Sequence, residues 1–96
     1  MANARMYLVN TLTGLAVQLG VFGCGATEWQ AGSSDGVSLL FAHVARRLGR
    51  DAYWPDVPYI LTGERILAGA VRLPDVPVLW QVSKDVLARL PKTGVF

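Results

Sequence analysis

The sequence is poor in the residues on which disulfides and metal sites depend. It has one cysteine, Cys24, and one histidine, His43. A single cysteine excludes a disulfide within the chain, and together with one histidine it falls short of the ligands of a structural zinc site. We therefore expect no bound metal, no cofactor and a reducing, cytoplasmic compartment.

Catalytic motifs are also missing. The chain has no glycine-rich loop followed by Lys-Ser or Lys-Thr that could hold a phosphate. Cys24 and His43 are the one candidate nucleophile–base pair, but nothing in the sequence brings them together. A lone cysteine in an apolar run is usually a small core residue. We interpret the chain as a non-enzymatic protein.

Positive charge is absent from a long stretch. Residues 6–45 contain no Lys or Arg, so eight of the nine basic residues lie from Arg46 onward, and the net charge is only +2. This balance is too weak to define a nucleic-acid-binding protein by itself.

Apolar residues, in contrast, are abundant. They make up 52% of only 96 residues, and a small domain has little interior in which to bury them. The excess favours an interface with a partner or another subunit, or contact with a membrane.

The N-terminal region predicts a β-hairpin over residues 5–24. Met6–Val9 is a short apolar run, residues 10–14 are rich in turn formers, and aliphatic residues then alternate from Leu15 to Val21. A period of two is typical of a strand with one buried face. A lipoprotein signal ending at Cys24 is an alternative, disfavoured by the polar residues that interrupt the apolar run and by the bulky Phe22.

A loop over Gly23–Gly36 and a helix over residues 34–48 are predicted next. Ser34 is suited to cap the helix, Asp35 lies in its first turn and Gly49 is a typical stop. The apolar residues that share one helical face are Val37, Leu40, Phe41, Val44 and Leu48.

The remaining chain repeats a proline-cornered unit. Pro-Asp-Val-Pro occurs at 55–58 and again at 74–77, each time before a short apolar run and then a helix-prone tract. We predict a strand at about 58–61, a helix at about 63–73, a strand at about 78–82 and a helix at about 83–90, with Thr62 and Ser83 as helix caps. Two alternatives remain: a β-hairpin turn and bulge over 63–73, because of Gly63 and Gly69, and one helix over 78–90.

These elements predict a small α+β protein with residues 1–96 as a single domain: an N-terminal β-hairpin, an amphipathic helix over 34–48, and two proline-cornered strand–helix units.

The candidate partner-binding surface lies at the end of the 34–48 helix and just after it. Arginine, tyrosine and tryptophan are enriched at interaction hot spots, and they gather here beside the single histidine. The candidate residues are His43, Arg46, Arg47, Arg50, Tyr53 and Trp54.

The sequence thus favours a small protein–protein interaction module, either a homo-oligomer or a subunit of a larger assembly. Its composition is also common among phage-encoded structural proteins, and if it is one of them it would reside in a virion instead of the cytoplasm. A small inhibitor of a host enzyme or defence complex is one alternative. A nucleic-acid-binding protein that uses Arg46, Arg47 and Arg50 is another. A membrane span is not expected, because the apolar run is short and rich in glycine.

Overall fold

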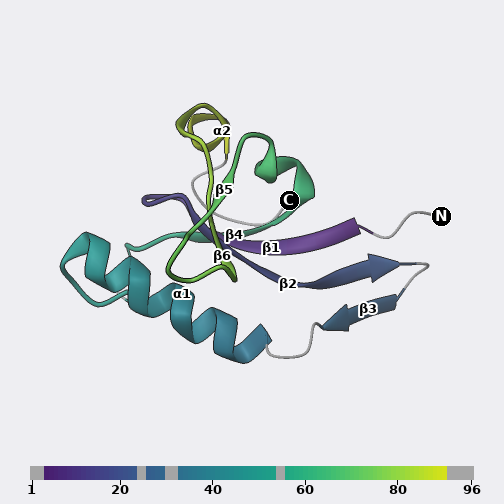
Figure 1. Cartoon of the computed structure of the whole chain (residues 1–96), viewed down its shortest axis with the longest axis horizontal. Coiled ribbons are helices and arrows are strands. Elements are labelled where there is room, and N and C mark those ends of the chain that lie inside the picture. The colour runs from purple at the N-terminus through teal and green to yellow at the C-terminus, as the bar shows by residue number, and fades with distance from the viewer. Residues whose placement is uncertain (1–3, 24–25, 30–32, 54–55, 91–96) are drawn as a thin grey trace.

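The computed structural model describes residues 4–23, 26–29, 33–53 and 56–90. They form an α+β domain (Figure 1). The elements in chain order are β1 (Ala4–Asn10), β2 (Leu15–Gly23), β3 (Ala26–Trp29), α1 (Ser33–Leu48), β4 (Tyr59–Gly63), the 3-10 helix η1 (Glu64–Leu67), β5 (Val71–Arg72), β6 (Leu79–Gln81) and α2 (Lys84–Arg89).

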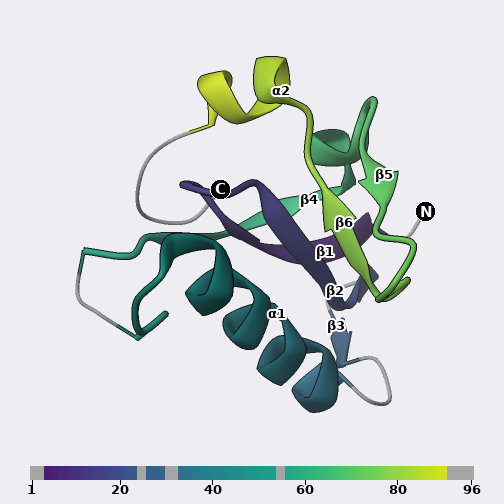
Figure 2. The same ribbon diagram turned by 60° about the vertical axis from the view of Figure 1, so that its left-hand side comes forward.

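The strands form one antiparallel sheet in the order β4-β1-β2-β6-β5, and β3 pairs with the second half of β2. β1 and β2 are therefore central. α1 lies on one side of the sheet, and η1 and α2 lie on the other side (Figures 1 and 2). The predicted α+β class and the N-terminal hairpin are confirmed.

The first core lies between the sheet and α1. Leu15, Val17 and Leu19 of β2 point toward the helix, as their alternation predicts, and they pack with Leu40 and Val44. The half-buried Val37, Phe41 and Leu48 complete the predicted apolar face of α1. Burial of one stripe of an amphipathic helix against a sheet is the main source of its stability.

α1 begins at Ser33, one residue before the predicted cap Ser34, and it ends at Leu48 as predicted. Gly49 follows with φ +67°, the left-handed conformation that glycine adopts at helix ends. Gly36 lets the first turn approach the sheet closely, since a Cβ there would lie 2.9 Å from Val17 Cγ2.

A second core fills the opposite face of the sheet. Tyr7 and Val9 of β1 pack with Ile60 of β4, Ile66 of η1 and Val82. Side chains of a strand alternate between faces, so β1 supplies Met6 to the first core and Tyr7 to the second. Two cores account for a large share of the apolar composition, because the central strands are covered on both faces.

The β1–β2 turn is held by a buried polar side chain. Asn10 is 0% exposed. Its Oδ1 accepts hydrogen bonds from the amides of Leu12 and Thr13 and from Thr13 Oγ1, and its Nδ2 donates to Pro58 O at 3.2 Å. Asn10 therefore fixes the turn and ties it to the segment that enters β4.

The predicted helix over 63–73 is wrong, and so is Thr62 as its cap. Thr62 lies within β4, and only Glu64–Leu67 forms a short 3-10 helix. Gly69 then adopts φ +76°, and β5 pairs with β6, which is closer to the hairpin alternative. The apolar residues do not share a face: Ile66 enters the second core, whereas Leu73 packs against the first.

The second proline-cornered unit has its predicted elements. β6 occupies Leu79–Gln81, and α2 begins after Ser83, whose Oγ accepts a hydrogen bond from the Val86 amide at 3.4 Å. A single helix over 78–90 is therefore excluded. The two units are not equivalent in space, since β4 pairs with β1 whereas β6 pairs with β2.

The predicted loop over Gly23–Gly36 is partly wrong. Ala26–Trp29 forms β3, which pairs with β2 from Gly20 to Gly23, and α1 begins three residues before Gly36. Cys24 lies outside the described residues, and with it the disfavoured candidate pair with His43 and the lipoprotein alternative.

Tyr59 provides a prediction about alkaline pH. Burial raises the pKa of its hydroxyl to about 12 and also raises the pKa of Tyr7. Because the folded-state pKa lies above the unfolded value of 10.0, the unfolded state ionises first, and the fold loses stability as the pH rises from 10 toward 12. We expect the free energy of unfolding, measured in urea, to fall across that interval, and less steeply in Tyr59→Phe.

The same variant tests a buried polar atom. By distance and angle, Tyr59 Oη has no hydrogen-bond partner among the residues that the structure describes, although the nearby Asn10 side chain acts to lower its pKa. The ring packs edge-on against Phe41 at 5.1 Å. Phenylalanine keeps the ring contact and removes the unsatisfied hydroxyl, so we expect Tyr59→Phe to be about 1 kcal/mol more stable at neutral pH. A loss of stability at neutral pH would show that the hydroxyl is satisfied in solution.

Candidate functional site

The structure divides the predicted partner-binding residues among three directions. Arg46 is exposed on the outer side of α1 and has no side-chain hydrogen bond or ion pair to a described residue. Leu39, two helical turns before Arg46, is 40% exposed, and the half-buried His43 lies between them on the same side of the helix. This outer face of α1, made of Leu39, His43 and Arg46, is its solvent-facing side.

Arg50 and Tyr53 lie on a different flank, beyond the end of α1. Arg50 Nη1 is 2.9 Å from Asp56 Oδ2, in an exposed ion pair. Tyr53 is 72% exposed, yet its ring packs against Phe41 with 4.9 Å between centroids. Phe41 belongs to the core-facing side of α1, so Tyr53 is separated from Arg46 by the body of the helix.

Arg47 points in a third direction, toward the end of the sheet. Its Nη1 donates to Thr13 O at 3.4 Å and to Gln81 Oε1. Arg47 lies on the border between the buried and the exposed face of α1, which explains this direction. Trp54 lies outside the described residues. The partner-binding role of all six residues stays a prediction.

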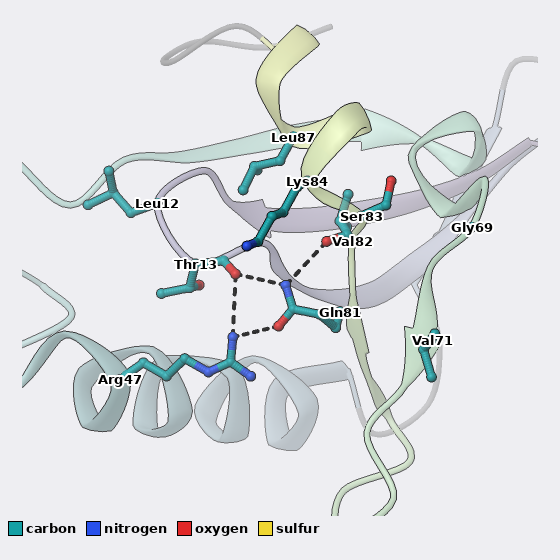
Figure 3. A pocket seen from close by; sticks show the side chains of 10 residues that line it. All are labelled: Leu12, Thr13, Arg47, Gly69, Val71, Gln81, Val82, Ser83, Lys84 and Leu87. Atoms are coloured by element: carbon teal, nitrogen blue, oxygen red, sulfur yellow. Dashed lines mark hydrogen bonds between the residues drawn. The ribbon is translucent and has the colours of Figure 1, made fainter.

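A groove of about 510 Å³ lies where the β1–β2 turn meets β6, β5 and α2 (Figure 3). Sequence reasoning did not identify it. Its lining residues come from five parts of the chain and are Leu12, Thr13, Arg47, Gly69, Val71, Gln81, Val82, Ser83, Lys84 and Leu87.

Gln81 organises the floor of the groove. Its Nε2 donates to Thr13 O at 2.8 Å and to Val82 O at 3.2 Å, while its Oε1 accepts from Arg47. Both ends of the amide are therefore satisfied, so its orientation is fixed, and with it the position of the Arg47 guanidinium.

The charges in the groove are of one sign. Arg47 and Lys84 line it, and none of its lining residues is acidic. Figure 3 shows the Lys84 ammonium directed toward Thr13 and Gln81, the same groups that hold Arg47. Lys84 forms no hydrogen bond or ion pair with a described residue. Two cations thus converge, and the described residues that line the groove include no acidic side chain.

The groove also carries exposed apolar surface. Leu12 is 45% exposed and Val71 is 65% exposed, and they lie at opposite sides of the cationic floor in Figure 3. No sequence signal could have joined these residues, because Leu12, Arg47, Val71 and Lys84 are far apart in the chain. The β2–β6 and β5–β6 pairings bring Leu12, Val71 and Lys84 together, and the packing of α1 on the sheet adds Arg47.

The residues that the structure describes contain neither a metal-binding cluster nor a membrane-spanning helix. Within residues 4–23, 26–29, 33–53 and 56–90, no three His, Cys, Asp or Glu side chains gather as a metal site would require. In the same part of the chain, no helix has both the length and the apolar character needed to cross a bilayer.

No protein-family model matches this chain, and comparisons with curated proteins and with solved structures find no similar protein. A functional proposal therefore depends on the chain's own surface.

Proposed function

We propose that this protein is a non-enzymatic protein–protein interaction module, acting in a homo-oligomer or as a subunit of a larger assembly. The observation that carries the proposal is the apolar surface left over after both faces of the sheet are covered. The large apolar side chains that stay exposed among the described residues are Leu12, Leu39, Tyr53, Val71 and Val78. Exposed apolar groups beside cations are typical of interaction surfaces.

Tyr53 has the properties of a contact residue. Its ring is exposed but already held against Phe41, so binding a partner would fix little additional freedom. Arginine and tyrosine are the residue types that most often supply binding energy. We therefore propose that the partner wraps around the end of α1, contacting Arg50 and Tyr53 on one flank and His43 and Arg46 on the outer face. The lone cysteine supports a cytoplasmic location, or a virion if the protein is phage-encoded.

The double variant Arg46→Glu, Arg50→Glu tests this surface. We expect it to lose assembly or partner binding in light scattering at high micromolar concentration, while the melting temperature changes little. The Arg50–Asp56 ion pair is exposed, and such pairs contribute about 0–1 kcal/mol. Arg65→Glu, an exposed arginine on η1, is the matched control and should assemble as the wild type does.

Two results would contradict the proposal. One is a double variant that assembles normally, which would leave the end of α1 as a solvated helix terminus. The other is a wild-type chain that stays monomeric and captures no partner.

Binding of nucleic acid is the less favoured function. Of the three arginines, Arg47 and Arg50 already hold protein acceptors, and only Arg46 has none among the described residues. If they contact phosphates, oligonucleotide binding should weaken steeply with salt, and Arg46→Ala should lower the slope by about one unit. Fluorescence anisotropy that shows no binding at low salt would remove this function.

A further inference from the structure

We infer that the groove between Arg47 and Lys84 binds an acidic segment of a partner polypeptide, with the carboxylate of an Asp or Glu between the two cations and apolar residues on either side. This inference rests on the proposed function and specifies the chemistry of the partner.

The first support is charge complementarity. The two basic residues line one groove, and none of its lining residues is acidic. Arg47 uses only Nη1 in its hydrogen bonds to Thr13 and Gln81, so the N–H groups of Nε and Nη2 have no acceptor among the described residues. Lys84 likewise has none for its ammonium. A carboxylate can accept from both side chains, and charge-assisted hydrogen bonds are the stronger kind.

The second support is rigidity. Gln81 is fixed by Thr13 O and Val82 O, and Val82 N donates in turn to Gly14 O at 2.8 Å. The turn, β6 and the Arg47 side chain therefore form one connected unit. A site ordered before binding loses less entropy when its ligand arrives.

The third support is the pair of apolar borders. Leu12 and Val71 are both largely exposed and lie on opposite sides of the cationic floor. An inorganic anion would leave both uncovered. A peptide with apolar residues flanking an acidic one would cover both while its carboxylate reaches the cations, and the groove volume of about 510 Å³ falls within the range typical of ligand sites.

The test begins with selection of a random peptide library, displayed on phage, against the immobilised full-length chain. We expect the enriched peptides to share an Asp or Glu flanked by apolar residues. A synthetic peptide of the enriched sequence is then titrated by fluorescence anisotropy against the wild type, Arg47→Gln and Lys84→Gln.

Each groove variant should weaken binding about tenfold or more, because each removes a charged donor. Replacing the peptide's acidic residue with its amide should weaken binding to a similar extent. Arg65→Gln, an exposed arginine outside the groove, is the matched control and should bind as the wild type does. Lys84 is exposed and has no described partner, so Lys84→Gln is expected to fold normally.

Several results would overturn the inference: no enriched peptide, enriched peptides without an acidic residue, or groove variants that bind as well as the wild type. Binding of a single-stranded oligonucleotide that is lost in Lys84→Gln would also overturn it, in favour of phosphate. If selection fails while the wild type assembles and Arg46→Glu, Arg50→Glu does not, the groove inference fails and the proposed function stands.

Discussion

Replacing Asn10 with Ala is expected to lower the free energy of unfolding by about 3 kcal/mol, a large share of the stability of a small domain. The side chain is 0% exposed and takes part in four hydrogen bonds. Alanine would leave the amides of Leu12 and Thr13 without this partner, while the Pro58 carbonyl would keep the Thr11 amide as a donor. Each unsatisfied buried group costs about 1–3 kcal/mol, and partial access of water to the turn limits the sum.

Urea denaturation checks this value, with Leu12→Ala as the matched control. Leu12 lies in the same turn but is 45% exposed, so its replacement should change the stability by no more than about 0.5 kcal/mol. An Asn10→Ala variant that loses less than about 1 kcal/mol would show that the turn keeps its shape without the asparagine.

Replacing Gly14 with Ala is expected to destabilise the protein by about 3 kcal/mol and to disturb the groove as well. Gly14 has φ +77°, which L-residues other than glycine adopt at an energetic cost of about 1 kcal/mol or more. Its surroundings add a steric conflict, because a Cβ would lie 2.6 Å from Gln81 Nε2 and 3.2 Å from Val82 O.

The variant Gly49→Ala separates the backbone cost of a positive φ from the steric cost of the added Cβ. Gly49 has nearly the same conformation, φ +67°, but a Cβ there would meet nothing within 4 Å. We expect Gly49→Ala to cost only the backbone contribution, about 1 kcal/mol. The difference between the two variants, measured in urea, gives the steric part. Equal losses would mean that Gln81 moves aside at no cost.

Peptide binding in the groove tests the same steric conflict at Gly14 independently of stability. If Gly14→Ala displaces Gln81, the Arg47 guanidinium loses the acceptor that orients it. Binding of the acidic peptide should then weaken in Gly14→Ala but not in Gly49→Ala. Peptide binding that is unchanged in Gly14→Ala would show that Arg47 does not need Gln81 to be positioned.

Local patterns were sufficient for much of the fold. The alternation from Leu15 to Val21 predicted a strand with a buried aliphatic face, and the apolar stripe from Val37 to Leu48 predicted α1, because both patterns follow from the geometry of a single element. Ser83 as a cap and Gly49 as a stop also depend only on neighbouring backbone groups.

Residues 63–73 show where local patterns fail. Ile66 and Leu73 fit a helical face in the sequence, yet they enter cores on opposite sides of the sheet. Each residue gains more by joining a different core than by sharing a helix. Local patterns also failed at residues 26–29, which were predicted as a loop. The strand β3 forms there because the backbone of β2 pairs with it.

The sequence by itself determined the hairpin, α1, α2 and the concentration of basic residues after residue 45, since each is set within one segment. Only the tertiary structure decided where the cations point. Arg46 and Arg47 are adjacent in the chain, but one faces outward and the other binds Gln81. The groove that joins Leu12, Arg47, Val71 and Lys84 exists because strand pairing and the packing of α1 on the sheet bring distant segments together, and no local rule encodes either.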